Sequence, residues 1–302
     1  LLLLARIVAG AFGGVLNAVV FALVADIIPP ERRGAANGII MSAFSVSSVV
    51  GIPIGLALAE MFNWHAAFYF IVILGVASLW ASSVYIPKVN NRSAAVPFGE
   101  LSRRFVSIAV EGLHLRGFLL TSLLAFGVFM IVPFLSPAMV RNVGLAESDL
   151  KYIYLVGGSA TVFSARFIGR MCDHLGPFRV FTWVAGISFL PLLLITHLGA
   201  TPIALTLCVS TLFMMTGSGR FIPAMTMLSI VIDPKKRGTF MGLENAFRQL
   251  SSGLASLVAG AMIYENAQGQ LVGFNRLGYV AVAVTLVSWF FARHIAKSSG
   301  VR

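Results

Sequence analysis

The chain has 302 residues, of which 58% are hydrophobic and 11% are charged, and its formal net charge is +11. This composition excludes a soluble globular domain, which carries roughly 25% charged residues, and the solid apolar runs exclude a membrane β-barrel, whose strands alternate polar and apolar residues. We therefore predict a polytopic helical membrane protein, and assign the excess positive charge to loops on one side of the bilayer rather than to nucleic-acid binding.

Nine apolar windows are long enough to cross a bilayer, which takes about 20 residues. The predicted crossings are 2–28, 35–60, 66–86, 117–140, 152–171, 178–196, 203–232, 239–264 and 278–295. One set of alternate loops holds fifteen lysines and arginines, and the other set holds only Arg141, Lys151 and Arg276. Because basic loops stay on the cytosolic side, we expect the first set and the C-terminus in the cytosol, and the protein in the cell (inner) membrane.

The chain begins with Leu1, which already lies in an apolar run and carries neither an initiator Met nor the basic region of a signal peptide. We interpret the sequence as a fragment that lacks its N-terminal part. The two cysteines, Cys172 and Cys208, give neither a disulfide framework nor a metal-binding spacing. No cofactor and no metal site is expected.

The region after the first predicted crossing has a counterpart later in the chain, at an offset of 204 residues (238 − 34). The matching positions are Pro30 with Pro234, Arg33-Gly34 with Arg237-Gly238, Gly38 with Gly242, and Ser47-Ser48 with Ser251-Ser252. The plain alternative is coincidence, because Arg-Gly after Pro is a common end to an apolar helix. Several matches at one offset favour two halves that are built alike.

One long linker, 87–116, divides the chain. Its Phe98, Leu101, Phe105 and Ile108 recur at helical spacing, which predicts either a helix on the cytosolic leaflet or a plain solvated linker. The repeat offset pairs the first crossing with the seventh, so the second half has six crossings and the first half only three. Equal halves would place three more helices before Leu1, so that 1–86 ends one six-helix bundle and 117–302 forms the other.

Two six-helix bundles joined by a cytosolic linker resemble the major facilitator superfamily, and several motifs agree with that family over all 302 residues. The motifs are Arg6 to Gly10 with Gly13-Gly14, Pro29 to Gly34, Gly51-x-Pro53-x-Gly55, Trp64-His65-Ala66-Ala67-Phe68, and Gly169 to Arg179. The motif Gly51-x-Pro53-x-Gly55 resembles the antiporter motif of arabinose-efflux-permease-like proteins in the drug:proton antiporter branch. In the fourth, Asn63 and His65 replace the family's Gly and Arg.

The resemblance implies an outer gate at Gly51, Pro53 and Gly55. Proline and glycine remove a helix hydrogen bond and let backbones approach closely. In the family this segment packs against the crossing that corresponds to 239–264 and seals the outer side. The alternative is ordinary packing of small residues.

The resemblance also implies a cytosolic latch at Gly169, Asp173 and Arg179. Bundle symmetry directs Asp173 to the start of the second crossing, near Gly34, in the outward-facing state. A carboxylate there can cap a helix N-terminus and can pair with Arg170 or Arg179. The alternative is an exposed ion pair that contributes little.

Charged residues inside the predicted crossings are the strongest signal that does not depend on the resemblance. Arg220 lies eleven residues before Val231 and Arg248 ten after Gly238, so both lie near the bilayer midplane. A charge there costs at least ~2.5 kcal/mol and is expected to face a partner or a watery cavity. The predicted substrate-binding or coupling residues are Arg6, Asn17, Arg220, Glu244, Asn245, Arg248 and Gln249. The alternative is a structural ion-pair network.

No enzyme constellation emerges, since the five histidines lie at loops or helix ends without ligand pairs or Ser/Asp partners. Cys172 beside Asp173 and His174 lies in a loop that the transporter motif already explains. We predict a proton-coupled secondary transporter, an efflux antiporter of a sugar-like or drug-like solute, in which one bundle rocks against the other. An uptake symporter or facilitator, a truncated non-transporting membrane protein and a membrane enzyme remain alternatives. Its partners are solute, protons and lipid, and a monomer is expected.

Overall fold

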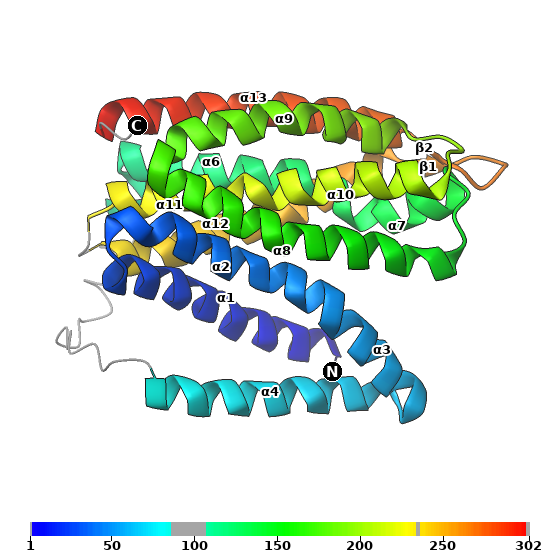
Figure 1. Ribbon diagram of the computed structural model, residues 1–302, viewed down its shortest axis with the longest axis horizontal. Helices are drawn as coiled ribbons and strands as arrows, with labels where there is room; N and C mark the ends of the chain where they lie inside the picture. Colours follow the sequence, from blue (N-terminus) through cyan, green and yellow to red (C-terminus); the bar gives the residue numbers. More distant parts are fainter. Residues whose placement is uncertain (1, 86–106, 234–235, 300–302) are drawn as a thin grey trace.

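Figure 1 shows the protein as a computed structural model, in which residues 2–85, 107–233 and 236–299 are described. Long helices dominate the described chain and run side by side along one axis. The helices of the first half are α1 (Leu2–Ile27), α2 (Arg33–Val46), α3 (Ile52–Met61) and α4 (Trp64–Tyr85). Those of the second half are α6 (Gly112–Phe129), α7 (Val132–Arg141), α8 (Leu150–Leu175), α9 (Pro177–His197), α10 (Ile203–Gly219), α11 (Phe221–Val231), α12 (Arg237–Met262) and α13 (Phe274–Ser299).

Helices occupy all nine of the predicted crossings, and three of these crossings consist of two helices joined at a break. The breaks are a π-helical turn over Ser47–Gly51, the pair Met130-Ile131, and Arg220. A proline lies in the first turn after each break, at Pro53, Pro133 and Pro223. Proline has no N–H for the carbonyl four residues earlier, so the helical hydrogen-bond ladder is interrupted there.

Five segments of the described chain are long and apolar enough to cross a membrane by length and composition alone. They are Trp64–Tyr85, Gly112–Arg141, Pro177–His197, Ile203–Val231 and Phe274–Ser298. Helices α8 and α12 have 26 residues each and are also long enough. They are less apolar because they carry charged side chains, among them Arg170 on α8 and Arg248 on α12.

A small hairpin interrupts the otherwise helical fold between α12 and α13. Strands β1 (Tyr264–Glu265) and β2 (Leu271–Val272) pair antiparallel, with Tyr264 opposite Val272. Asn142, just after α7, donates from its side chain to the carbonyl of Leu271 (2.9 Å) and accepts from its N–H (2.8 Å). The sequence predicts only a loop here, because two-residue strands carry no periodic pattern.

The buried apolar side chains of the described chain all lie in the second half, from Ile108 onward. At the end where α6 and α12 begin, Phe118 stacks on Phe240 with ring centroids 4.8 Å apart. Ile108 is part of this core, and so differs from both alternatives predicted for the linker, a helix on the membrane surface and a solvated segment. The reason is its apolar contact with the bundle, and the rest of the predicted surface helix falls outside the described residues.

We call the end of the molecule where α2 and α12 begin and α8 ends the basic end. It lies at the left of Figure 1, whereas the hairpin lies at the right. Of the first half, α2 packs along α8 and α11, and α1 packs along α12. All 22 residues of α4 are at least partly exposed.

Candidate functional site

The two halves approach each other most closely where α2 lies beside α8 at the basic end (Figure 1). Gly34 and Gly38 on α2 face Gly169 and Ala165 on α8. A Cβ added to Gly38 would lie 2.5 Å from the carbonyl oxygen of Ala165, and one added to Gly34 would overlap the carbonyl oxygen of Gly169. Small residues four apart on both helices therefore allow direct backbone contact.

Asp173 connects the two halves at this contact. Its two carboxylate oxygens accept hydrogen bonds from the N–H groups of Gly34 (2.7 Å) and Ala35 (2.9 Å), in the first turn of α2. These donors have no partner within their own helix, and the positive end of the helix dipole favours a carboxylate. Burial raises the pKa of Asp173, while the two N–H donors act in the opposite direction.

The structure differs from the predicted ion pairing around Asp173. Both carboxylate oxygens are taken by backbone N–H groups, and the side chains of Arg170 and Arg179 are exposed. Within the described part of the chain, Arg179 makes no side-chain hydrogen bond or ion pair. The contact is therefore a helix cap, in which Arg179 takes no part here.

The position of Asp173 depends on a one-residue joint between α8 and α9. Gly176 has φ +89° and ψ 140°, a region that is essentially restricted to glycine, and Pro177 begins α9 directly after it. Proline at the first helical position needs no N–H partner. The joint therefore ends α8 sharply, three residues after Asp173.

Two further polar contacts join α2 to α11, and the sequence analysis did not predict them. Arg33 donates from Nη1 to the carbonyl of Ser229 (2.7 Å), and Asn37 donates from Nδ2 to Thr226 Oγ1 (3.1 Å). All four residues are buried. A signal was present in the sequence, because Arg33 and Asn37 are four apart and share one helix face in an otherwise apolar segment.

We expect Asp173→Asn to weaken closure of the basic end. Each carboxylate oxygen accepts one N–H bond, and the amide replaces one of these oxygens with an NH2 group, which cannot accept. One charge-assisted bond is worth about 1.5 kcal/mol, or roughly tenfold in population. Spin labels at the exposed positions Glu31 and Arg170 would report this as a larger fraction of long distances. Asp149→Asn, at the far end of α8, serves as the control, and equal distance distributions in both variants would contradict the prediction.

An ion pair joins the start of α6 to the start of α12 at the basic end. Lys236 Nζ donates to Glu111 Oε2 (2.7 Å), and His114 Nδ1 lies 3.3 Å from the same oxygen. The hydrogen bond from Lys236 is the main reason that the pKa of Glu111 is lowered, and the same bond raises the pKa of Lys236.

These two shifts predict a bounded pH range of stability. Glu111 stabilises the fold above its unfolded pKa of about 4.3, and this is lost as pH falls through its lower folded pKa. Lys236 stabilises the fold at pH values below its unfolded pKa of about 10.4. This stabilisation is lost as pH rises through its higher folded pKa. Melting temperatures in detergent should therefore differ between wild type and Glu111→Gln at neutral pH and converge in acid. The exposed Glu147→Gln should show no such convergence.

The predicted residues of α12 form a connected polar cluster. Arg248 donates from Nε to Glu244 Oε1 (3.1 Å) and from Nη2 to Asn245 Oδ1 (2.7 Å). Glu244 is 1% exposed and lies against Thr121 of α6, whereas Arg248 remains 21% exposed in its side chain. The buried carboxylate is thus neutralised by an arginine that reaches the helix surface.

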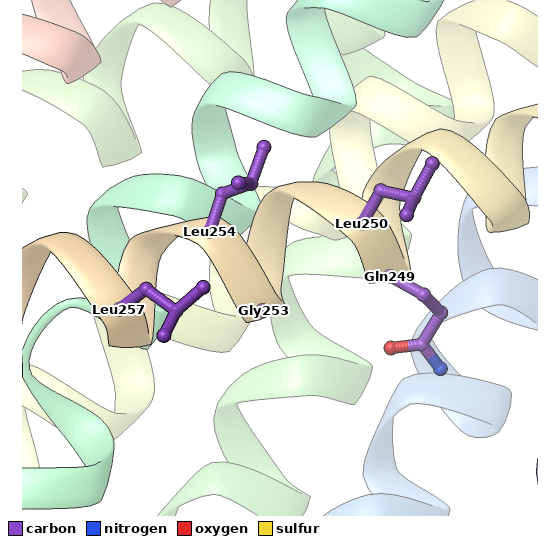
Figure 2. Close-up of a pocket in the computed structure, with 5 residues that line it drawn as sticks. All are labelled: Gln249, Leu250, Gly253, Leu254 and Leu257. Carbon is purple, nitrogen blue, oxygen red and sulfur yellow. The ribbon is translucent and has the colours of Figure 1, made fainter.

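Gln249 lies beside this cluster and lines an open groove of about 400 Å³ along α12. The other lining residues are Leu250, Gly253, Leu254 and Leu257. Figure 2 shows the Gln249 side chain directed toward the blue helices of the first half, and away from Leu250 and Leu254. All five lining residues belong to α12, and its three leucines are exposed, so the groove is an open face of one helix.

The expected outer gate is not assembled in this conformation. A Cβ at Gly55 would meet nothing within 4 Å, and one at Gly51 would meet only Ser47 of its own turn. Across the boundary between the halves, the π-helical turn and α2 lie against α8, whereas α12 lies against α1. The predicted packing of this motif against α12 is therefore not formed in this conformation, and it stays a prediction for a conformation in which the outer side is closed.

Three predicted residues have side chains outside the described part of the structure, namely Arg6, Asn17 and Pro53. Arg220 is described and lies away from the α12 cluster. It is 1% exposed at the break between α10 and α11 and donates from Nη1 to Thr285 of α13. The structure thus brings Glu244, Asn245 and Arg248 together and leaves Arg220 apart.

The sequence pattern of the Major Facilitator Superfamily matches residues 1–256 and, in a second match, residues 117–300. The chain belongs to the Major Facilitator Superfamily. The second match covers the second half by itself, which agrees with the internal repeat read from the sequence.

Known proteins resemble this superfamily member over most of its length. It is 22% identical to the uncharacterized MFS-type transporter YtbD of Bacillus subtilis, over 74% of this chain and 59% of that one. It is 24% identical to a chloramphenicol resistance protein of Streptomyces lividans, over 89% of this chain and 66% of that one. It therefore spans less than two thirds of either relative. The human organic anion transporter MFSD10 has the same fold, with a TM-score of 0.73 and 18% identity, over 91% of this chain and 67% of that one.

Proposed function

We propose that this chain belongs to a secondary transporter that exports a small solute in exchange for protons, by alternating access. The observation that carries the proposal is the contact at the basic end. Two halves of a repeated fold meet there through glycine backbones and a few polar bonds, including the cap of Asp173 on α2. Such a contact holds the halves together, and the free energy needed to separate them is small enough for solute binding to supply.

The loop charges supply the orientation of the proposed cycle. The basic end carries the loops assigned to the cytosol, so the C-terminus is cytosolic and the closed contact faces inward. The conformation described here is then the outward-facing one. Opening to the cytosol requires Asp173 to leave α2, and sealing of the outer side falls to Gly51, Pro53 and Gly55.

The relatives favour export over import. Relatives named for chloramphenicol resistance and quinolone resistance are 24% and 22% identical to this chain, and such resistance fits removal of a drug from the cell. We place proton coupling on Glu244 and Arg248, because this is a buried carboxylate whose partner reaches the helix surface. Gln249 contributes hydrogen bonds to the solute at the groove, and Asn245 holds Arg248 in place.

The test uses the protein expressed from its full reading frame and reconstituted into liposomes with an imposed pH gradient. Internal pH is followed while chloramphenicol, a quinolone or a sugar is added. Solute-dependent proton flux in the direction opposite to the solute supports antiport. Flux in the same direction as the solute would instead establish a symporter, and solute movement without proton flux a facilitator. Absence of any solute movement would overturn the proposed transport.

A further inference from the structure

Arg220 is the most completely buried arginine of the described chain, and the proposed transport cycle does not use it. It lies eleven residues before Val231 at the end of α11, roughly 16 Å from the basic end and near the middle of a hydrocarbon core about 30 Å thick. Its side chain is 1% exposed. A cation at this depth is costly, so its surroundings need an explanation.

Only one of the three guanidinium nitrogens of Arg220, Nη1, has a hydrogen-bond partner in the described structure. Nη1 donates to Thr285 Oγ1 (2.5 Å), and the Thr285 hydroxyl donates to the carbonyl of Ala281 (2.7 Å). Because the Thr285 hydroxyl uses its hydrogen on Ala281, its oxygen can only accept from Arg220, and this bond orients the guanidinium. Nε and Nη2 of Arg220 are buried, and neither has a hydrogen-bond partner in the described structure.

The two unpartnered atoms form one side of the planar guanidinium. Nε–H and Nη2–H point in parallel, at the spacing that matches the two oxygens of a carboxylate. No carboxylate with a described side chain takes this place, because the buried Glu244 is bound by Arg248. A single cation with two parallel donors suits a monoanion with two oxygens in one plane. A neutral solute would leave the charge unbalanced.

We propose that Arg220 is a binding site for the carboxylate of a small organic anion. Thr285 holds the guanidinium in place, and the Nε and Nη2 edge receives both oxygens. The inference names a ligand class for the proposed transporter, and so rests on that function. Binding, however, is measured without transport, and the two can fail separately.

The position of Arg220 at a helix break gives the ligand a way in. Pro223 interrupts the ladder between α10 and α11, and α11 contacts α2 through Thr226 and Ser229. When the basic end opens, α11 loses these contacts and is free to shift at the break. Ligand entry requires that this movement exposes the donor edge, which is inaccessible in the closed conformation.

The experiment measures the melting temperature of the purified protein in detergent, at constant ionic strength, with benzoate or with its neutral analogue benzamide. Benzoate should raise the melting temperature of wild type and benzamide should not. Arg220→Lys keeps the charge but loses the parallel donors, so its affinity for benzoate should fall about tenfold. Arg220→Met should lose the response, and the exposed Arg166→Lys should keep it.

A purely structural arginine would give a different pattern. Removing a structural arginine would lower the melting temperature measured without ligand. An arginine that serves ligand binding destabilises the empty protein, so Arg220→Met should then melt at or above the temperature of wild type. Equal shifts with benzoate and benzamide, or an undiminished benzoate shift in Arg220→Met, would overturn the proposal. If Arg220→Met does not fold, Thr285→Val retains the arginine and should weaken benzoate binding. Benzoate binding without solute flux would contradict only the proposed transport.

Discussion

Gly34→Ala is expected to disfavour closure of the basic end strongly and to slow transport. The added Cβ would lie 2.5 Å from Asp173 Oδ1 and 2.8 Å from Cys172 Cβ, and would overlap the carbonyl oxygen of Gly169. Overpacking of this kind costs about 2 kcal/mol, which corresponds to roughly 30-fold fewer closed molecules. The change adds one methyl group and leaves every charge in place.

The chain contains its own reporter and its own control for this experiment. Cys172 is buried at the contact and Cys208 is exposed, so a Cys208→Ser background leaves one thiol that reacts only when the halves separate. N-ethylmaleimide should label Gly34→Ala much faster than wild type. Gly238→Ala, the repeat counterpart, adds the same methyl where nothing lies within 4 Å and should label like wild type. Equal labelling of the two variants would refute the closed contact.

Arg248→Ala is expected to destabilise the protein strongly. It leaves the carboxylate of Glu244 buried without a counter-charge, and breaking a buried pair from one side costs about 3 kcal/mol. The matched control is Arg141→Ala, which breaks the exposed pair with Glu265 and should cost less than about 1 kcal/mol. Thermal unfolding in detergent compares the two variants directly.

The same pair also tests coupling. Glu244→Gln combined with Arg248→Gln replaces two charges with two amides of similar size, so much of the stability lost in Arg248→Ala should return. If the pair carries protons, the double variant folds but shows no solute-dependent proton flux. Normal flux in the double variant would make Glu244 and Arg248 a structural pair and contradict the proposed coupling role.

The sequence predicted the large-scale architecture because membrane helices are set by length and apolarity. All nine crossings coincide with helices, and the fold is that of the Major Facilitator Superfamily. The breaks at Met130-Ile131 and Arg220 were not predicted, although Pro133 and Pro223 mark them. A proline weakens one hydrogen bond, and packing decides whether the helix bends, kinks or continues.

Residue spacing by itself could predict the site only where one helix carries the whole arrangement, whereas the placement of Asp173 near Gly34 came from the family resemblance. Glu244 and Arg248 are four apart, so helical geometry alone brings them together. The partners of Arg33, Asn37 and Arg220 lie on other helices, and no spacing in the sequence encodes those contacts. The predicted outer gate depends on the same kind of information, because which helices adjoin across the halves depends on their tilt.

The cap of Asp173 on α2 has a consequence for the evolutionary record of this protein. The carboxylate binds two backbone N–H groups, which almost any residue supplies, rather than a complementary side chain. A change at position 35 that avoids proline therefore calls for no compensating change at position 173. Correlated substitution between the two positions should be weak across homologues. Methods that infer contacts from covariation would then miss a principal connection between the halves, and would find more readily the pairing of Glu244 with Arg248.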